Sequence, residues 1–119
     1  MQVELLLSSV AFDDDRIDVE ARRLLKELRH EVDAGARLPS GPPLPGAKGD
    51  VVWIGQIVVE LVSSGAVTAF LGLLTAYVTM RPKLKIVVRK PDGSEIDLSA
   101  ENVTDNAAAV ALELKRYFP

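Results

Sequence analysis

The stretch Val51–Met80 reads VVWIGQIVVELVSSGAVTAFLGLLTAYVTM, and Glu60 is its one charged residue. Its length and hydropathy predict two helices, Asp50–Ser63 and Ala66–Met80, with a turn or kink at Ser63–Gly65. A segment this apolar is expected to lie at the centre of a small protein, where amphipathic elements on either side can pack against it. We therefore expect the architecture to form around this stretch.

The second predicted helix has two faces of different character. Small and polar residues recur on one face at helical spacing, and large apolar residues occupy the other: Thr68, Gly72, Thr75 and Thr79 against Val67, Phe70, Leu71, Leu74 and Val78. The polar face is interpreted in two ways. It is a solvent-facing stripe, or it is a surface for a partner or a second copy of the chain, because small side chains let another helix approach closely.

A membrane span is the competing interpretation of the same stretch. Residues 61–80 are uncharged and, at about 1.5 Å per residue, long enough to cross about 30 Å of hydrocarbon. Arg81, Lys83 and Lys85 follow as a basic flank, in agreement with the positive-inside rule. The polar stripe and Gly65 argue against a span. We favour a buried core helix, with a small regulator anchored in the inner membrane as the alternative.

The segments before this stretch predict a strand, a helix and a short edge strand. Apolar residues alternate in Gln2–Ser8, which is typical of a strand. The acidic triplet Asp13–Asp15 precedes an apolar pattern of helical spacing over Ile17–Val32. Ala36–Pro39 is interpreted as a short edge strand, and Ser40–Gly49, with three Pro and three Gly, as a surface loop.

The segments after it predict a hairpin and a last helix. Lys83–Leu98 alternates on both sides of Pro91–Gly93, so we expect two paired strands with Lys and Arg opposite Glu and Asp. Ala107–Phe118 carries an apolar stripe, and a cap is expected at Thr104 or Asp105. The predicted fold class is α+β. One domain over residues 1–119 has about four strands with helices packed on them, in the order β-α-β-αα-β-β-α.

Composition excludes several classes of function. The chain has 119 residues, 14 Lys and Arg, 17 Asp and Glu, and a net charge of -3, so it lacks the electrostatic footprint of a nucleic-acid-binding protein. The absence of Cys excludes disulfides, thiolate zinc sites and a cysteine nucleophile. The opening residues Met1–Glu4 lack the basic start of a signal peptide, and we expect a cytoplasmic location.

Three candidate ligand or catalytic sites fail on chemical grounds. Gly41–Lys48 resembles a phosphate-binding loop, but its three prolines remove the backbone donors that a phosphate needs. Asp13–Asp15 and Asp18 lack the alternating ligands and the Gly of a calcium loop, so we interpret them as helix-capping residues. His30 is the one imidazole and has no nucleophile near it in the sequence. We therefore expect no metal and no cofactor.

A serine hydrolase is kept as an alternative that relies on Ser63 or Ser64. These residues lie in a Ser-Ser-Gly segment, but the flanking glycines of a nucleophile elbow and a nearby base are missing from the sequence. An enzyme of this size needs a nucleophile, an acid or a metal site, and the chain offers no convincing set. The sequence therefore favours a binding protein without catalytic residues.

Five short segments together resemble a known family: Val3–Leu5, Pro42–Gly46, Ser63–Ala69, Lys85–Val88 and Pro91–Gly93. These segments are similar to those of the effector-associated constant component family. Its members are parts of bacterial conflict systems, which act in defence. The resemblance implies a non-enzymatic adapter or regulatory subunit encoded beside a variable effector. It also implies that this effector is a protein partner, often a caspase-like or trypsin-like peptidase.

Overall fold

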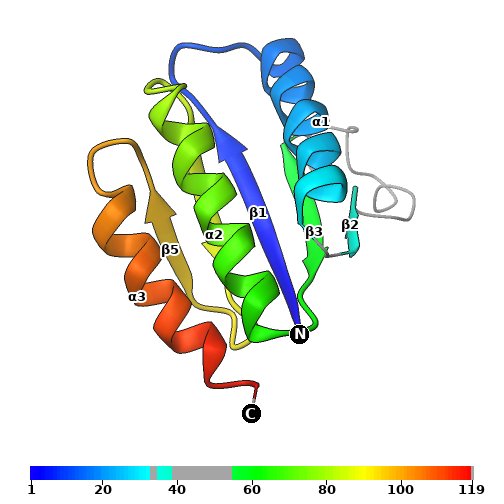
Figure 1. Ribbon diagram of the computed structural model, residues 1–119. Coiled ribbons are helices and arrows are strands. Elements are labelled where there is room, and N and C mark those ends of the chain that lie inside the picture. The colour runs from blue at the N-terminus through cyan, green and yellow to red at the C-terminus, as the bar shows by residue number, and fades with distance from the viewer. Residues whose placement is uncertain (33–34, 39–54, 119) are drawn as a thin grey trace.

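The computed structural model describes residues 1–32, 35–38 and 55–118 (Figure 1). These residues form three helices and one antiparallel sheet with the strand order β2-β3-β1-β4-β5. The elements in chain order are β1 Gln2–Ser8, α1 Asp14–Glu31, β2 Gly35–Arg37, β3 Gln56–Glu60, α2 Ser64–Thr79, β4 Lys85–Arg89, β5 Glu95–Leu98 and α3 Val103–Lys115. The predicted α+β class is confirmed, but the sheet has five strands where about four were expected.

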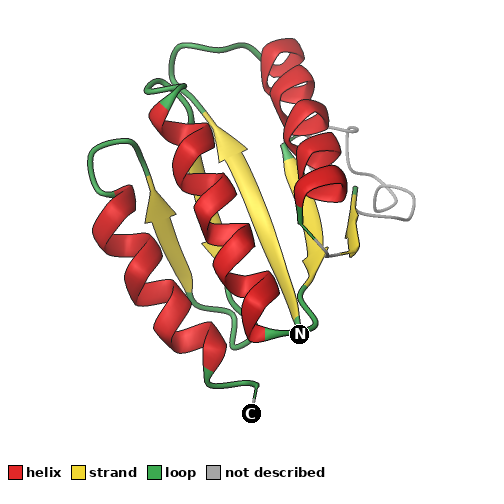
Figure 2. Cartoon of the chain, viewed as in Figure 1, coloured by secondary structure: helices red, strands yellow, loops and turns green. Residues whose placement is uncertain are grey.

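The helices and the sheet form two layers. All three helices lie over the same face of the sheet, and α2 lies between α1 and α3 (Figure 2). The strands point alternate residues into this interface, among them Val3, Leu5 and Leu7 of β1, which are buried. The apolar stripes of the helices meet these side chains, so one continuous core lies between the layers.

The helix predicted over Asp50–Ser63 is wrong where the structure describes it, because Gln56–Glu60 is strand β3. β3 pairs with β1 on one side and β2 on the other. Its residues Ile57, Val58 and Val59 are all buried, so the strand has a continuous apolar run and lacks the alternation that identifies half-exposed strands. Short runs of this kind cannot be told from buried helix by periodicity. The residues before Gly55 in this prediction, like the loop predicted over Ser40–Gly49, lie outside the described residues.

Gly55 explains why the chain turns into β3 at this point. Its φ is +81°, a left-handed conformation that favours glycine, and its carbonyl oxygen accepts a hydrogen bond of 2.8 Å from the N–H of Leu7. A Cβ atom on Gly55 would lie 2.6 Å from the carbonyl oxygen of Leu7. The residue therefore has to be glycine for β3 to start beside β1.

Ser63–Gly65 begins α2 and is not a kink between two helices. Ser63 is the N-cap, and its Oγ accepts a hydrogen bond of 3.1 Å from the N–H of Ala66. Within the described part of the chain, no helix has the length and hydropathy needed to cross a bilayer. In residues 61–80, for which a membrane span was the competing prediction, the helix is α2, which covers the 16 residues Ser64–Thr79.

The expected helix after Asp13–Asp15 is confirmed as α1, and Asp13 caps it by accepting a hydrogen bond of 2.9 Å from the N–H of Arg16. The last helix is also confirmed, but its predicted cap is wrong. α3 starts at Val103 after Asn102, whose Oδ1 accepts from the N–H of Ser99 at 2.9 Å. Asn102 therefore fixes the connection from β5 and leaves α3 without a side-chain cap.

The hairpin of β4 and β5 is confirmed together with its charge pairs. Lys85 lies 3.4 Å from Asp97, and Arg89 lies 2.9 Å from Glu95. Gly93 in the turn has a φ of +90°. The opposite side of β4 is buried under the helices through Ile86 and Val88, as the alternation predicted.

The outer edge of β5 is tied to α3. A hydrogen bond of 2.8 Å from the N–H of Lys90 to the carbonyl of Ser94 closes the turn, so the backbone groups of Glu95 and Asp97 point away from β4. The side-chain amide of Asn106 donates to the carbonyl of Asp97 at 2.7 Å. A group that would otherwise be open at the sheet edge is thus occupied by α3.

Candidate functional site

The four residues predicted as a partner interface lie along the outward side of α2. Thr68, Gly72 and Thr79 are exposed, and Thr75 is half-buried. The opposite side of the helix is buried on the sheet, so the predicted division of α2 into two faces is confirmed. The role of the four residues as an interface stays a prediction.

The threonine hydroxyls of this face bond to the helix itself. Thr68, Thr75 and Thr79 donate to carbonyl oxygens four residues earlier, at 3.3, 2.8 and 2.7 Å. Because each hydroxyl donates its proton within the helix, these threonines have no hydroxyl proton left to donate to a partner. The face is consequently less polar than its composition indicates.

The neighbouring helix also exposes small and apolar residues. α3 packs beside α2 (Figure 2) and exposes Ala108, Ala109 and Leu112. α2 has no charged residue between Ser64 and Thr79. We define the α2–α3 outer face by its exposed small and apolar residues, together with the half-buried Thr75: Thr68, Ala69, Gly72, Thr75, Ala76 and Thr79 of α2, and Ala108, Ala109 and Leu112 of α3.

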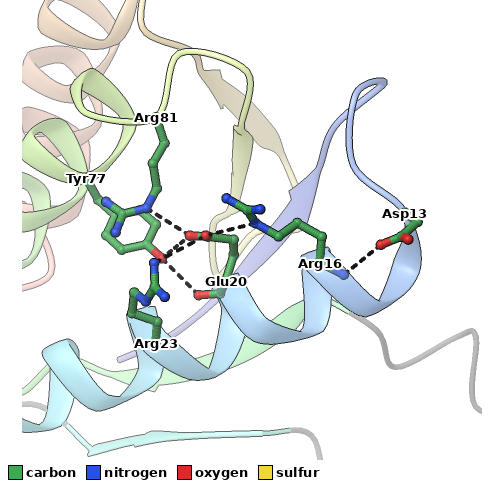
Figure 3. Close-up of polar contacts among 6 residues, drawn as sticks. All are labelled: Asp13, Arg16, Glu20, Arg23, Tyr77 and Arg81. Carbon is green, nitrogen blue, oxygen red and sulfur yellow. Dashed lines mark hydrogen bonds and ion pairs between the residues drawn. The ribbon is translucent and has the colours of Figure 1, made fainter.

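A second feature is a buried carboxylate on α1, Glu20, with an exposed fraction of 1% (Figure 3). Its Oε2 accepts hydrogen bonds from the hydroxyl of Tyr77 at 2.6 Å and from Nε of Arg81 at 2.8 Å. Its Oε1 lies 3.4 Å from Nη1 of Arg23 and 3.4 Å from Nε of Arg16. We call these five residues the Glu20 cluster.

Three segments position this cluster. Helical spacing places Arg16 and Arg23 on either side of Glu20 along α1. Tyr77 reaches α1 from near the end of α2, and Arg81 follows that end. The guanidinium of Arg81 also lies 3.9 Å from the centre of the Tyr77 ring, which is a cation–π contact. The cluster therefore joins α1 to the end of α2 within the helix layer.

The surroundings shift two pKa values in the cluster. Burial on its own would raise the pKa of Glu20, but the Tyr77 hydrogen bond and the charges of Arg81 and Arg23 outweigh burial and lower it. Burial raises the pKa of Tyr77, and the hydrogen bond and negative charge of Glu20 raise it further. Glu20 is thus held as a carboxylate and Tyr77 as a neutral donor.

The Glu20 cluster was not predicted from the sequence, although a signal for it exists. Glu20 falls on the buried stripe of α1, three residues after Ile17 and four before Leu24. A carboxylate in such a position is almost never buried without a partner. The position of Glu20 therefore indicates a buried pair, but the sequence does not show that Tyr77 and Arg81 supply it.

The candidate catalytic and metal-binding residues have structural contacts. Asp13 caps α1, Asp18 accepts from Nε of Arg22 at 3.0 Å, and Ser63 caps α2. His30 and Ser64 are exposed. Across residues 1–32, 35–38 and 55–118, no three His, Asp or Glu side chains are grouped so that they could hold a metal ion.

Comparison with known proteins places the chain in a family. No curated protein and no solved structure matched it. A family model described as Effector Associated Constant Component 1 matches residues 13–117, which include all three helices and the strands β2 to β5. The protein therefore belongs to the Effector Associated Constant Component 1 family.

Proposed function

We propose that this protein is a non-enzymatic adapter or regulatory subunit of a bacterial conflict system, which binds an effector protein through the α2–α3 outer face. The observation that carries the proposal is that α2 has no charged residue along its whole length and that α3 beside it exposes Ala108, Ala109 and Leu112. Surface helices normally present charged residues to solvent, and the core of a protein interface is depleted in them.

The family supports an effector as the partner, since its members are described as components associated with effectors. We propose a peptidase of caspase-like or trypsin-like type as the effector, on the resemblance found in the sequence. The chain acts as one domain over residues 1–119 in the cytoplasm. A second copy of the chain is the competing occupant of the same face.

The test measures complex formation with the effector encoded beside this protein. Gly72→Arg places a long charged side chain on the face, and a Cβ at Gly72 meets no atom within 4 Å, so the fold is expected to stay intact. Thr75→Arg is the second variant. Val19→Arg, on the exposed side of α1, is the matched control.

Light scattering decides between the outcomes. We expect the mass of a complex for the native chain and for Val19→Arg, and the mass of separate proteins for Gly72→Arg and Thr75→Arg. If the native chain and all three variants formed the complex equally well, the α2–α3 outer face would not be the binding surface. A doubled mass of the chain alone, lost in Gly72→Arg, would assign the face to a second copy instead.

The non-enzymatic part of the proposal has its own test. The Oγ of Ser63 already accepts a hydrogen bond as the cap of α2, which favours a structural role. We expect a serine-directed covalent probe to leave the protein unlabelled. Labelling that disappears in Ser63→Ala or Ser64→Ala would establish the hydrolase alternative.

A further inference from the structure

The Glu20 cluster contains more positive charge than its carboxylate neutralises. Three guanidinium groups surround one carboxylate, which leaves a surplus of two positive charges. Arg16 and Arg23 have side-chain exposures of 57% and 51%, so much of this surplus faces solvent. We propose that Arg16, Arg23 and Arg81 form a recognition surface for carboxylate side chains of an acidic segment in a protein partner.

The donors that such a segment needs are available. A guanidinium has five N–H donors in a planar fork. The contacts with Glu20 are made by Nε of Arg16, Nε of Arg81 and Nη1 of Arg23. The terminal nitrogens of Arg16, whose side chain is 57% exposed, make none of these contacts and suit the two-pronged binding of a carboxylate, and Arg81, which is 21% exposed, borders them.

Two of the three guanidinium groups, those of Arg16 and Arg81, are also held in place before any partner arrives. Arg81 is stacked on Tyr77, and Arg16 lies 4.8 Å from the centre of the Phe12 ring. The Nε atoms of both side chains also contact the carboxylate of Glu20, which further restricts the position of each guanidinium. Binding by side chains that are already ordered loses less conformational entropy than binding by free surface arginines.

The surrounding charges favour a short acidic segment over a nucleic acid. The chain has a net charge of -3, and Asp13, Asp14 and Asp15 lie directly before Arg16 on the same helix. These carboxylates repel a long polyanion, which needs an extended basic surface. A local surplus of two charges matches one or two carboxylates.

The cluster adjoins the proposed partner face. Arg81 follows the exposed residues Thr79 and Met80 at the end of α2. An apolar contact with a charged border is the usual arrangement of a protein interface. The identity of the partner rests on the proposed function, whereas the affinity of the arginines for carboxylates is measurable without it.

The experiment uses a tetraglutamate peptide, acetylated and amidated at its ends, as the probe. Binding is followed by calorimetry and by the Nε–H NMR signals of the arginines, at about 20 mM and about 200 mM salt. We expect saturable shifts of the Arg16 and Arg23 signals, and weaker binding at the higher salt concentration. Each of Arg16→Gln and Arg23→Gln should weaken binding about fivefold.

Arg22→Gln is the matched control, because it removes the same charge from the same helix at a residue that pairs with Asp18 outside the cluster. It should bind as the native chain does. Arg81 is left unchanged because its bond to the buried Glu20 supports the fold.

The inference would be overturned by the absence of any shift of the Arg16 and Arg23 signals at saturating peptide, or by an equal loss of binding in Arg22→Gln. Tighter binding of a short DNA duplex than of the peptide would overturn it as well. Displacement of the peptide by inorganic phosphate at lower concentration would assign the surface to phosphate groups and overturn the carboxylate partner. A complex with the effector without peptide binding would leave the proposed function standing alone. Peptide binding without a complex with the effector would support the carboxylate-binding surface and contradict the proposed function.

Discussion

The hydroxyl of Tyr77 lies 2.6 Å from Oε2 of Glu20, 57 positions away in the chain. This bond joins α1 and α2 directly, within the helix layer. Both helices also pack on the sheet through apolar side chains, which tolerate small sliding movements more easily than a buried hydrogen bond does. The pair therefore fixes how far α1 is shifted along α2.

Tyr77→Phe should lower the free energy of unfolding by about 1 to 3 kcal/mol, since a buried carboxylate loses its shortest hydrogen bond. Denaturation by urea measures the change. Tyr117→Phe removes the same group from an exposed residue and should stay within about 0.5 kcal/mol of the native chain. Equal midpoints for both variants would mean that the bond contributes no net stability.

Glu20→Gln should destabilise the protein in a manner that depends on pH. The pKa of Glu20 is lowered in the folded protein, so its carboxylate stabilises the fold at pH values above the unfolded-state pKa of about 4.3. This contribution is lost as the pH falls through the lower folded-state pKa. We expect the difference between native and variant chains to be largest near neutral pH and to shrink on acidification.

Unfolding in urea at pH 7 and at about pH 3 tests whether the stability difference between the native chain and Glu20→Gln shrinks on acidification. The exposed Glu101→Gln serves as the control for a carboxylate outside the cluster. A difference for Glu20→Gln that grows on acidification would contradict the lowered pKa.

Two glycine substitutions should act in opposite directions. Gly72→Ala should stabilise the protein by about 0.5 to 1 kcal/mol, because the new methyl group meets no atom within 4 Å and alanine favours a helix. Gly55→Ala should destabilise it by more than about 1 kcal/mol, because φ is +81° and the methyl group would collide with Leu7. Thermal unfolding of the two variants compares them directly, and a lower melting temperature for Gly72→Ala than for Gly55→Ala would contradict both assignments.

Ile86→Asp should unfold the protein, since Ile86 has no exposed surface and an unpaired carboxylate there costs several kcal/mol. Lys83→Asp introduces the same residue at an exposed position just before β4 and should leave the fold intact. Circular dichroism at 25 °C distinguishes the two. A folded Ile86→Asp variant would show that β4 is not part of the core.

The elements that follow from local signals could be predicted from the sequence. The β4–β5 hairpin has alternation on both sides of a short turn, and α1 has an acidic cap before a clean apolar stripe. β3 could not be predicted, because it is buried on both faces between β1 and β2. That burial is a property of the assembled sheet and leaves no periodic signal in five residues.

The same distinction applies to the candidate sites. The face of α2 could be predicted, since the spacing of Thr68, Gly72, Thr75 and Thr79 is a property of a single helix. The Glu20 cluster could not be predicted from the sequence, because it depends on which residues of α2 come to lie beside α1. A buried acidic position on an apolar stripe shows that partners are required, and the packing of two helices decides which ones.

The bond from Asn106 to the carbonyl of Asp97 affects how copies of this protein behave at high concentration. An open strand edge is a template on which a second chain can add by backbone pairing, and growth of this kind leads to aggregates. With one outward carbonyl of β5 already bonded to α3, an incoming strand has to displace the Asn106 side chain before it can pair with Asp97. Asn106 thus makes this position of the β5 edge less available to a strand from another copy of the chain.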